Sequence, residues 1–270
     1  MKKIQQITPE LSLFEYNEIP VLEINHPKVK AKVALQGAHL FSWQPKHTDQ
    51  DVFWLSEIEP FKLGSAIRGG VPICYPWFGS LGEPFHGTAR IRLWEFNQYE
   101  ITKDKVFLRF DLKSENGQGL DAQMAMELGD TCTLTLTHQG SGQANPALHS
   151  YFNIADISQV ELHGLPTTVF NHLTHQQESV SSPRLIAENV DEMYSVENAV
   201  TTIVDKGYQR QIEVQHINST EVVVWNPWHK QTSNMTDTGY KTMVCAETAR
   251  IHTSLNQGQM IQAKISVKSN

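Results

Sequence analysis

Apolar residues recur at every second position along most of the chain, which is the period of a β-strand with one buried face. Within residues 29–35, for example, valine, alanine and leucine alternate with Lys30, Lys32 and Ala34. The same alternation predicts strands at 99–101, 106–112, 124–128, 132–136, 212–214, 222–225 and 261–267. We find no long stretch with helical spacing, so strands should dominate the fold.

Short turns join several of these predicted strands. Lys103-Asp104 separates the arms of one hairpin, and Gly129-Asp130 separates the arms of the next. Strands joined by short turns pair antiparallel, whereas parallel strands need long crossovers. We therefore expect an all-β fold, a large antiparallel β-sandwich. No linker and no break in composition interrupts the chain, so residues 1–270 should form a single domain.

Two segments break the alternation. Residues 64–79 read GSAIRGGVPICYPWFG, in which paired glycines, prolines and aromatics indicate an irregular backbone that approaches something closely. Residues 145–153 read NPALHSYFN and place a histidine within an apolar and aromatic stretch. Either segment could be structural, but both carry unusual chemistry for a sandwich, so candidate functional residues are sought there first.

The composition argues against several partners and locations. The chain has 270 residues, with 22 Lys and Arg against 29 Asp and Glu and a net charge of −7, and its basic residues are scattered. We expect no binding to nucleic acid, because the phosphates would need a basic surface. No apolar run approaches the ~20 residues of a membrane span and the first ten residues are polar, so we expect no membrane association and a cytoplasmic location. Three widely spaced cysteines should be reduced.

His149 and Glu247 are the candidates for acid–base chemistry. His149 lies beside Leu148, Tyr151 and Phe152, where burial would disfavour the imidazolium and a nearby carboxylate would favour it. Glu247 lies in the apolar run TMVCAETA, in which a charged residue is out of place unless it is paired, hydrogen-bonded or functional. A core histidine and a solvated strand-end glutamate are the structural alternatives.

Arg68 and Arg90 both flank glycine-containing bends. Two guanidinium groups that converge would suit a phosphate dianion better than a neutral sugar, although surface ion pairs are the alternative. Asp191 by itself is a surface loop acid. The aromatic residues of the 64–79 segment could belong to the core or stack on a sugar ring.

Other sites are not supported by the sequence. His172 and His175 lack two further spaced ligands, so no metal site is expected. Cys245 has no neighbour that would lower its pKa, which argues against a nucleophile. The chain contains neither a glycine-rich phosphate loop nor a GxSxG motif.

Taken together, ordered blocks of residues show that the chain resembles the aldose 1-epimerase (mutarotase) superfamily, and within it the hexose-6-phosphate mutarotase branch, the glucose-6-phosphate 1-epimerases. The likeness spans nearly the whole chain. Its blocks are LQGAHL at 35–40, AIRGGVPIC at 66–74, His86-Gly87 with Arg90, LHSYFN at 148–153 and CAETA at 245–249.

The resemblance implies a galactose mutarotase-like β-sandwich and an acid–base reaction without a cofactor. By resemblance, His149 is the general acid that protonates the ring oxygen, and Glu247 is the general base that takes the proton of the anomeric hydroxyl. Arg68 and Arg90 match positions associated with phosphate binding. The remaining two matches are on the substrate side: Asp191, which contacts sugar hydroxyls, and His86.

The expected activity is therefore the interconversion of the anomers of a hexose 6-phosphate, with a small-molecule hexose phosphate as the partner and a monomer or weak homodimer as the assembly. An epimerase of unphosphorylated aldoses remains an alternative, as does a protein that binds carbohydrate or phosphosugar without turnover. A glycosidase fits less well, since it would need two carboxyl groups and this site offers one. An acid–base pair predicts a bell-shaped pH dependence of kcat/KM.

Overall fold

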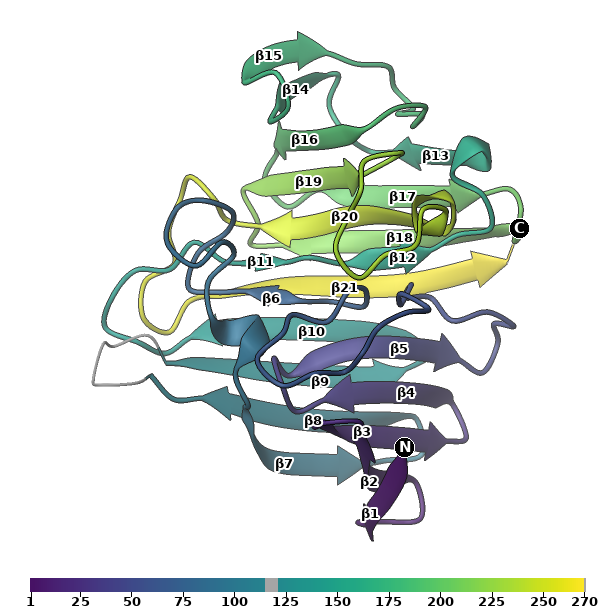
Figure 1. Ribbon diagram of the computed structural model, residues 1–270, viewed down its shortest axis with the longest axis vertical. Coiled ribbons are helices and arrows are strands. Elements are labelled where there is room, and N and C mark those ends of the chain that lie inside the picture. Colours follow the sequence, from purple (N-terminus) through teal and green to yellow (C-terminus); the bar gives the residue numbers. More distant parts are fainter. Residues whose placement is uncertain (115–120, 270) are drawn as a thin grey trace.

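The computed structural model describes residues 1–114 and 121–269, and its strands form three antiparallel sheets (Figure 1). The first sheet follows the chain in simple up-and-down order, with each strand paired to the next. Its strands are β1 (Lys2–Gln6), β2 (Leu11–Tyr16), β3 (Ile19–His26), β4 (Val29–Ala34) and β5 (His39–Pro45).

The second sheet has eight strands in the order β13-β17-β18-β21-β10-β9-β8-β7. The C-terminal strand β21 lies at its centre and joins strands from the middle and the later part of the chain. Its strands are β7 (Glu95–Ile101), β8 (Lys105–Leu112), β9 (Ala122–Gly129), β10 (Thr131–His138), β13 (Val160–His163), β17 (Val200–Asp205), β18 (Arg210–Ile217) and β21 (Met260–Ser269).

The third sheet runs β15-β14-β16-β19-β20-β11-β6, and β12 pairs with β20 beside β11. Its strands are β6 (Ile73–Cys74), β11 (Ala147–Leu148), β12 (Tyr151–Asn153), β14 (Thr168–Asn171), β15 (Gln176–Ser179), β16 (Val190–Ser195), β19 (Glu221–Asn226) and β20 (Met243–Ala249). Among the described residues, short 3₁₀ turns accompany the strands at η1 (Ala89–Ile91), η3 (Ile157–Gln159) and η4 (Gly239–Thr242).

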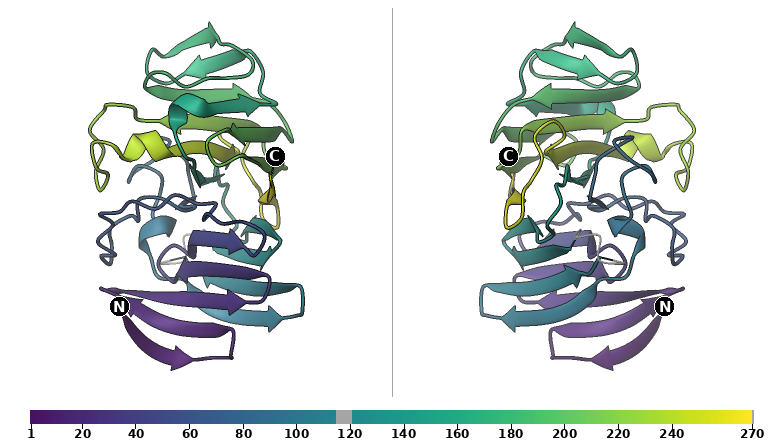
Figure 2. Two further views of the ribbon diagram at one scale, coloured as in Figure 1. Left: turned by 90° about the vertical axis from the view of Figure 1, so that its right-hand side faces the viewer. Right: turned by 90° about the vertical axis from the view of Figure 1, so that its left-hand side faces the viewer.

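The second sheet forms a continuous back layer for the other two. Trp43 of the first sheet donates its indole N–H to the carbonyl of Gly129 at one end of this layer (3.3 Å). At the other end, His216 of β18 hydrogen-bonds Thr248 of β20 in the third sheet (2.8 Å). Figure 2 shows the first sheet beside the β7–β10 half and the third sheet in the opposite half of the molecule. Because one sheet backs both halves, we propose that residues 1–270 form one domain, although 115–120 and 270 lie outside the described residues.

The all-β, antiparallel prediction is confirmed. In the β7–β8 hairpin Ile101 faces Val106, and in the β9–β10 hairpin Met126 faces Leu134, as the alternation indicates. Ala34 is an exception, because it is fully buried although its alternating position places it on the polar face with Lys30 and Lys32. A small apolar cluster with Phe41 and Ile67 among its members covers that face at the end of β4.

The 64–79 segment is irregular, as predicted, with β6 as its only strand. Gly69 and Gly70 have positive φ values of 121° and 59°. A Cβ atom at Gly69 would lie 2.4 Å from the carbonyl oxygen of Trp54, and one at Gly70 would lie 2.5 Å from that of Leu40. Only glycine therefore allows this backbone to pass so close to the neighbouring strands, and the passage fixes Arg68 directly beside them.

Neither a membrane-spanning helix nor a disulfide is found among the described residues. Within residues 1–114 and 121–269, no helix has the length and apolarity that crossing a bilayer requires. Cys74, Cys132 and Cys245 are all buried and unpaired, in agreement with the prediction that they are reduced.

Candidate active site

The third sheet presents two rows of side chains on the face turned away from the back layer. Residues paired across neighbouring strands share a face. Asp191, Trp225 and Cys245 are paired in one such row across β16, β19 and β20, and Tyr151 of β12 continues it. The next row brings Glu247 of β20 opposite Val223 of β19. The sheet register therefore sets these side chains next to one another although their positions in sequence differ by up to about a hundred residues.

A cavity of about 990 Å³ lies over these rows, and all six predicted site residues line it. Segments outside the sheets form its rim and contribute Arg68, His86 and, from η1, Arg90. The strands of the third sheet and the segment between β11 and β12 contribute His149, Asp191 and Glu247. The structure thus brings together every residue singled out in the sequence.

His149 and Glu247 face each other directly. His149 Nε2 lies 3.3 Å from Glu247 Oε1, and the two side chains are only 10% and 1% exposed. The imidazole ring stacks on the ring of Tyr151 at 4.8 Å and 11°, which fixes its plane. His149 Nδ1 and Glu247 Oε2 have no hydrogen-bond partner in the structure. Each member of the pair therefore has one buried polar atom without a partner, while Nε2 and Oε1 face each other.

Burial sets the protonation of this pair. Exclusion of water raises the pKa of the Glu247 carboxyl well above its usual value, and the charge of Asp191 adds to that shift. Exclusion of water also lowers the pKa of His149 well below its usual value, and the surrounding cationic side chains add to this effect. Both shifts favour an uncharged pair, with the shared proton on the carboxyl group and a neutral imidazole.

Arg68 is held by three hydrogen bonds before any ligand arrives. Nε and Nη2 donate to the carbonyl and the hydroxyl of Ser233, both at 3.0 Å, and Nη1 donates to Tyr151 Oη at 2.8 Å. A guanidinium carries five N–H donors. Two of them, one on each terminal nitrogen, therefore remain for a ligand.

Arg90 and His86 also line the cavity. Arg90 Nη2 donates to the carbonyl of Phe85 (2.8 Å), whereas its buried Nε has no partner in the structure. The backbone N–H of Gly79 donates to His86 Nδ1 (2.9 Å), so the ring proton is on Nε2. Burial lowers the pKa of His86 to about 3, so this ring is a neutral donor, 5.5 Å from the ring of His149.

Asp191 is a strand residue, contrary to the prediction of a loop acid. It lies in β16, where cross-strand pairing with Trp225 turns it toward the cavity. His172 Nδ1 lies 2.8 Å from Asp191 Oδ1, and the backbone N–H of His172 donates to the carbonyl of Asp191 (2.9 Å). The turn after β14 therefore holds the carboxylate in place.

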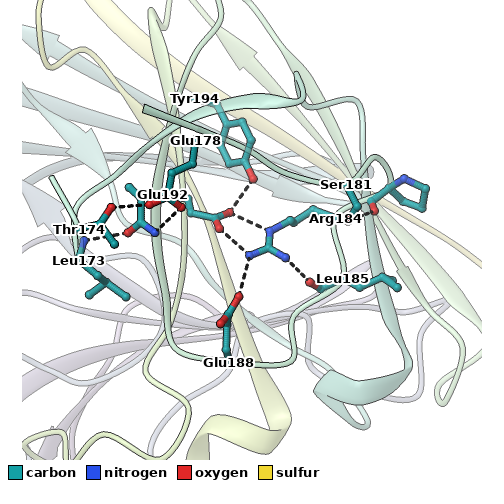
Figure 3. Close-up of polar contacts among 11 residues, drawn as sticks. Leu173, Thr174, Glu178, Ser181, Arg184, Leu185, Glu188, Glu192 and Tyr194 are labelled. Atoms are coloured by element: carbon teal, nitrogen blue, oxygen red, sulfur yellow. Dashed lines mark hydrogen bonds and ion pairs between the residues drawn. The ribbon is translucent and has the colours of Figure 1, made fainter. Parts of the chain in front are cut away.

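The opposite face of β16 is anchored by a buried ion pair (Figure 3). Arg184 Nε and Nη2 donate to the two carboxylate oxygens of Glu192 at 3.0 and 2.6 Å, and Tyr194 Oη donates to Glu192 at 2.7 Å. Arg184 also forms an antiparallel bridge with Leu162 of the back sheet. This pair connects the strand that carries Asp191 to the layer behind it.

Sequence reasoning missed three residues of the site. Tyr151 was noticed only as a neighbour of His149, yet it contacts both His149 and Arg68. His172 was considered only as a metal ligand, and Ser233 was not considered. For Tyr151 a signal was available, since it follows His149 by two positions in a strand-like run. The contacts of His172 and Ser233 join distant segments and have no local signal.

One group of possible metal-binding side chains occurs among the described residues, namely His149, Cys245 and Glu247, whose ligand atoms lie within 4.8 Å of one another. The imidazole and carboxyl of this group already contact each other. Burial raises the pKa of the Cys245 thiol well above its usual value, so the sulfur is protonated. We describe the group as an acid–base pair beside a buried thiol.

Comparisons with known proteins identify the family of the chain. The family model described as Aldose 1-epimerase matches residues 20–268. A protein of Haemophilus influenzae named "Putative glucose-6-phosphate 1-epimerase" is 51% identical over 266 residues, which are 98% of both chains. A Salmonella typhimurium protein of the same name is 37% identical and covers 91% of this chain and 88% of its own.

Solved structures give the same result. The crystal structure of a protein named HI1317 is 53% identical and superposes with a TM-score of 0.96 over 99% of both chains. The crystal structure of "a putative mutarotase (YeaD)" from Salmonella typhimurium is 34% identical, with a TM-score of 0.94 over 99% of this chain and 97% of its own. The predicted mutarotase-like sandwich is therefore confirmed.

Proposed function

The chain belongs to the aldose 1-epimerase family, and we propose that it is a glucose-6-phosphate 1-epimerase, which interconverts the α and β anomers of a hexose 6-phosphate. The observation that carries this proposal is a buried imidazole–carboxyl pair in one cavity with two guanidinium groups. The pair suits the acid–base chemistry of ring opening. The two cations suit a phosphate group on the same substrate.

The proposed reaction needs one acid and one base at the same time. His149 donates a proton from Nε2 to the ring oxygen while Glu247 removes the proton of the anomeric hydroxyl, and the C1–O5 bond breaks to give the aldehyde. Rotation about C1–C2 turns the other face of the carbonyl toward O5. Ring closure then reverses the two proton transfers. Only protons move between enzyme and substrate, so the reaction itself requires no cofactor.

The protonation state that burial favours fits this order of proton transfers. Before ring opening the reaction uses imidazolium and carboxylate, and after it the pair is left as neutral imidazole and carboxylic acid. The second arrangement is the one that burial favours. We infer that the cavity stabilises the pair in the state that accompanies the open-chain aldehyde.

The other residues are assigned to binding. Arg90, with its unpartnered Nε, and the two remaining donors of Arg68 are proposed to hold the phosphate. Asp191, oriented by His172, accepts hydrogen bonds from sugar hydroxyls. His86 donates from Nε2, because its Nδ1 is occupied by the Gly79 N–H.

Removing the guanidinium of Arg90 separates a phosphosugar epimerase from the two alternatives. In Arg90→Met we expect KM for glucose 6-phosphate to rise by roughly 10–100-fold, since a hydrogen bond to a charged group contributes about 1.5–3 kcal/mol. The rate on glucose should not fall, because glucose has no phosphate for Arg90 to bind. The measurement is exchange between the anomers, followed by NMR and corrected for the buffer rate.

The same assay on the wild-type protein distinguishes the alternatives. Equal rates on glucose and glucose 6-phosphate, unchanged in Arg90→Met, would indicate an epimerase of unphosphorylated aldoses. Binding of the phosphosugar in a calorimeter without acceleration above buffer would indicate a binding protein. Arg90→Lys is the control that keeps the charge and loses the fork.

The pH dependence of kcat/KM is expected to be a bell with a broad top. Loss of the shared proton is opposed because burial raises the pKa of Glu247, and gain of a second proton is opposed because burial lowers the pKa of His149. The alkaline limb should therefore lie above the usual carboxyl range and the acid limb below the usual imidazole range of about 6.5. The substrate phosphate also ionises near pH 6. Its titration is therefore measured separately by ³¹P NMR, and the profile of kcat/KM is corrected for it. An acid limb that remained at the ordinary histidine value would contradict the assignment.

We further propose that the protein acts in the cytoplasm as a monomer or weak homodimer. The support for the location is the set of three buried, unpaired cysteines, which suits a reducing compartment. Sedimentation at several protein concentrations measures the assembly.

A further inference from the structure

The imidazole of His149 lies among groups that oppose its protonation. Arg68 donates to the Tyr151 hydroxyl at 2.8 Å, and the Tyr151 ring stacks on the imidazole. The ring of His86, on the side of Arg90, approaches the imidazole at 5.5 Å. After burial, His86, Arg68 and Arg90 are the neighbours that lower the pKa of His149, and of these the two arginines carry a positive charge.

The remaining groups around the pair do not offset the positive charges of Arg68 and Arg90. Burial raises the pKa values of the Tyr151 phenol and the Cys245 thiol, so both are neutral. Asp191 acts on Glu247, whose pKa it raises. Burial and these charges therefore favour the shared proton on Glu247 rather than on His149, across a separation of 3.3 Å between Oε1 and Nε2.

A phosphorylated substrate changes the position of the shared proton, because its covalent structure places the phosphate close to the ring oxygen. In a hexose 6-phosphate the ring oxygen and the phosphorus atom are separated only by C5, C6 and O6. An acid that protonates the ring oxygen must therefore lie near the phosphate. A phosphate monoester carries a charge of about −1.5 to −2 at neutral pH, enough to offset both guanidinium charges.

We propose that the phosphate of the substrate activates the catalytic acid: by binding between Arg68 and Arg90 it draws the shared proton from Glu247 Oε1 to His149 Nε2. This inference rests on the proposed function and adds a cause for substrate preference. The proton transfer is internal to the pair, so the number of protons in the site does not change. The products of the transfer are the imidazolium and carboxylate that ring opening uses.

A consequence is that phosphate contributes to kcat as well as to KM. When an unphosphorylated sugar binds in the cavity, the positive charges of Arg68 and Arg90 stay uncompensated. The shared proton then stays on Glu247, where it cannot protonate the ring oxygen. A phosphate that is not attached to the sugar should then restore activity. D-Xylose, which is glucose without its C6 group, leaves room for inorganic phosphate as a separate activator.

The decisive test is a ¹⁵N NMR titration of His149 with inorganic phosphate at constant pH and ionic strength, with protein labelled at histidine and the His149 signal identified by its loss in His149→Gln. We expect the Nε2 signal to move toward the imidazolium position as phosphate saturates, while the signal of His172 stays in place. The shift should be lost in Arg90→Met. The rate of D-xylose anomerisation should rise about 10-fold or more at saturating phosphate, since each unit of pKa change is a factor of ten.

Saturable phosphate binding, followed on the ³¹P signal, without movement of the His149 signal would overturn this inference and leave the proposed function intact. Absence of phosphate binding, together with equal rates on glucose and glucose 6-phosphate, would overturn both. Sulfate at the same concentration serves as a second anion. It should move the His149 signal in the same direction if charge is the cause, and a shift with phosphate alone would contradict the electrostatic explanation.

Discussion

Glu247→Gln is expected to lower kcat for glucose 6-phosphate by about 10²–10⁴-fold, the contribution of a positioned acid–base group. Glutamine keeps the size and one oxygen of the side chain but can neither take the anomeric proton nor share one with His149. Because the change removes proton transfer and leaves the phosphate contacts untouched, KM should change little. Exchange NMR between the anomers, with the buffer rate subtracted, measures both constants.

Glu127→Gln is the matched control, because it makes the same substitution in an exposed pair with Lys105 on the back sheet. Its kcat should equal that of the wild type. The assignment of Glu247 as the base would be wrong if Glu247→Gln kept more than about a tenth of the wild-type kcat, since general base catalysis contributes at least about 10²-fold in typical cases. Near-ultraviolet circular dichroism checks that the variant is folded.

Arg184→Met is expected to lower the free energy of unfolding by about 3–5 kcal/mol, because it leaves the carboxylate of Glu192 buried without its partner. Glu192 is 3% exposed and receives two hydrogen bonds from Arg184 (Figure 3). The tyrosine hydroxyl that also contacts it cannot replace a positive charge. Urea unfolding followed by tryptophan fluorescence measures the change.

Lys105→Met gives the comparison for an exposed pair. Lys105 and Glu127 are both nearly half exposed, and such pairs contribute about 0–1 kcal/mol. An Arg184→Met protein as stable as Lys105→Met would show that the buried pair is not needed for the link between β16 and the back sheet. A double variant, Arg184→Met with Glu192→Leu, should recover stability, because it removes the unpaired charge as well.

Much of the fold could be predicted because each strand carries its own signal. Alternating apolar positions with short turns at Lys103-Asp104 and Gly129-Asp130 identify two hairpins and imply antiparallel pairing. The order of the strands in the sheets could not be obtained in this way. The C-terminal strand β21 lies between β10 and β18, and no local pattern indicates partners so distant in sequence.

Some residues of the site could likewise be found from the sequence, and others could not. His149 and Glu247 could be found because a titratable side chain in an apolar run is conspicuous. The stack of Tyr151 on His149 and the contact between His172 and Asp191 depend on which strands become neighbours. Asp191 illustrates the difficulty, since its surroundings in sequence are those of a loop and only pairing with β19 makes it part of the cavity wall.

The irregular passage through Gly69 and Gly70 holds Arg68 at the cavity from outside the sheet that carries the acid–base pair. The acid–base pair and Asp191 depend on the third sheet, whose other face is packed into the core, so a change there disturbs the whole sandwich. Arg68 and Arg90 belong to segments outside that sheet. Substrate specificity and proton transfer therefore depend on different parts of the structure. Substitutions in the rim can change which group on the sugar is bound while the acid–base pair stays the same. One fold can in this way act on different aldoses by the same reaction.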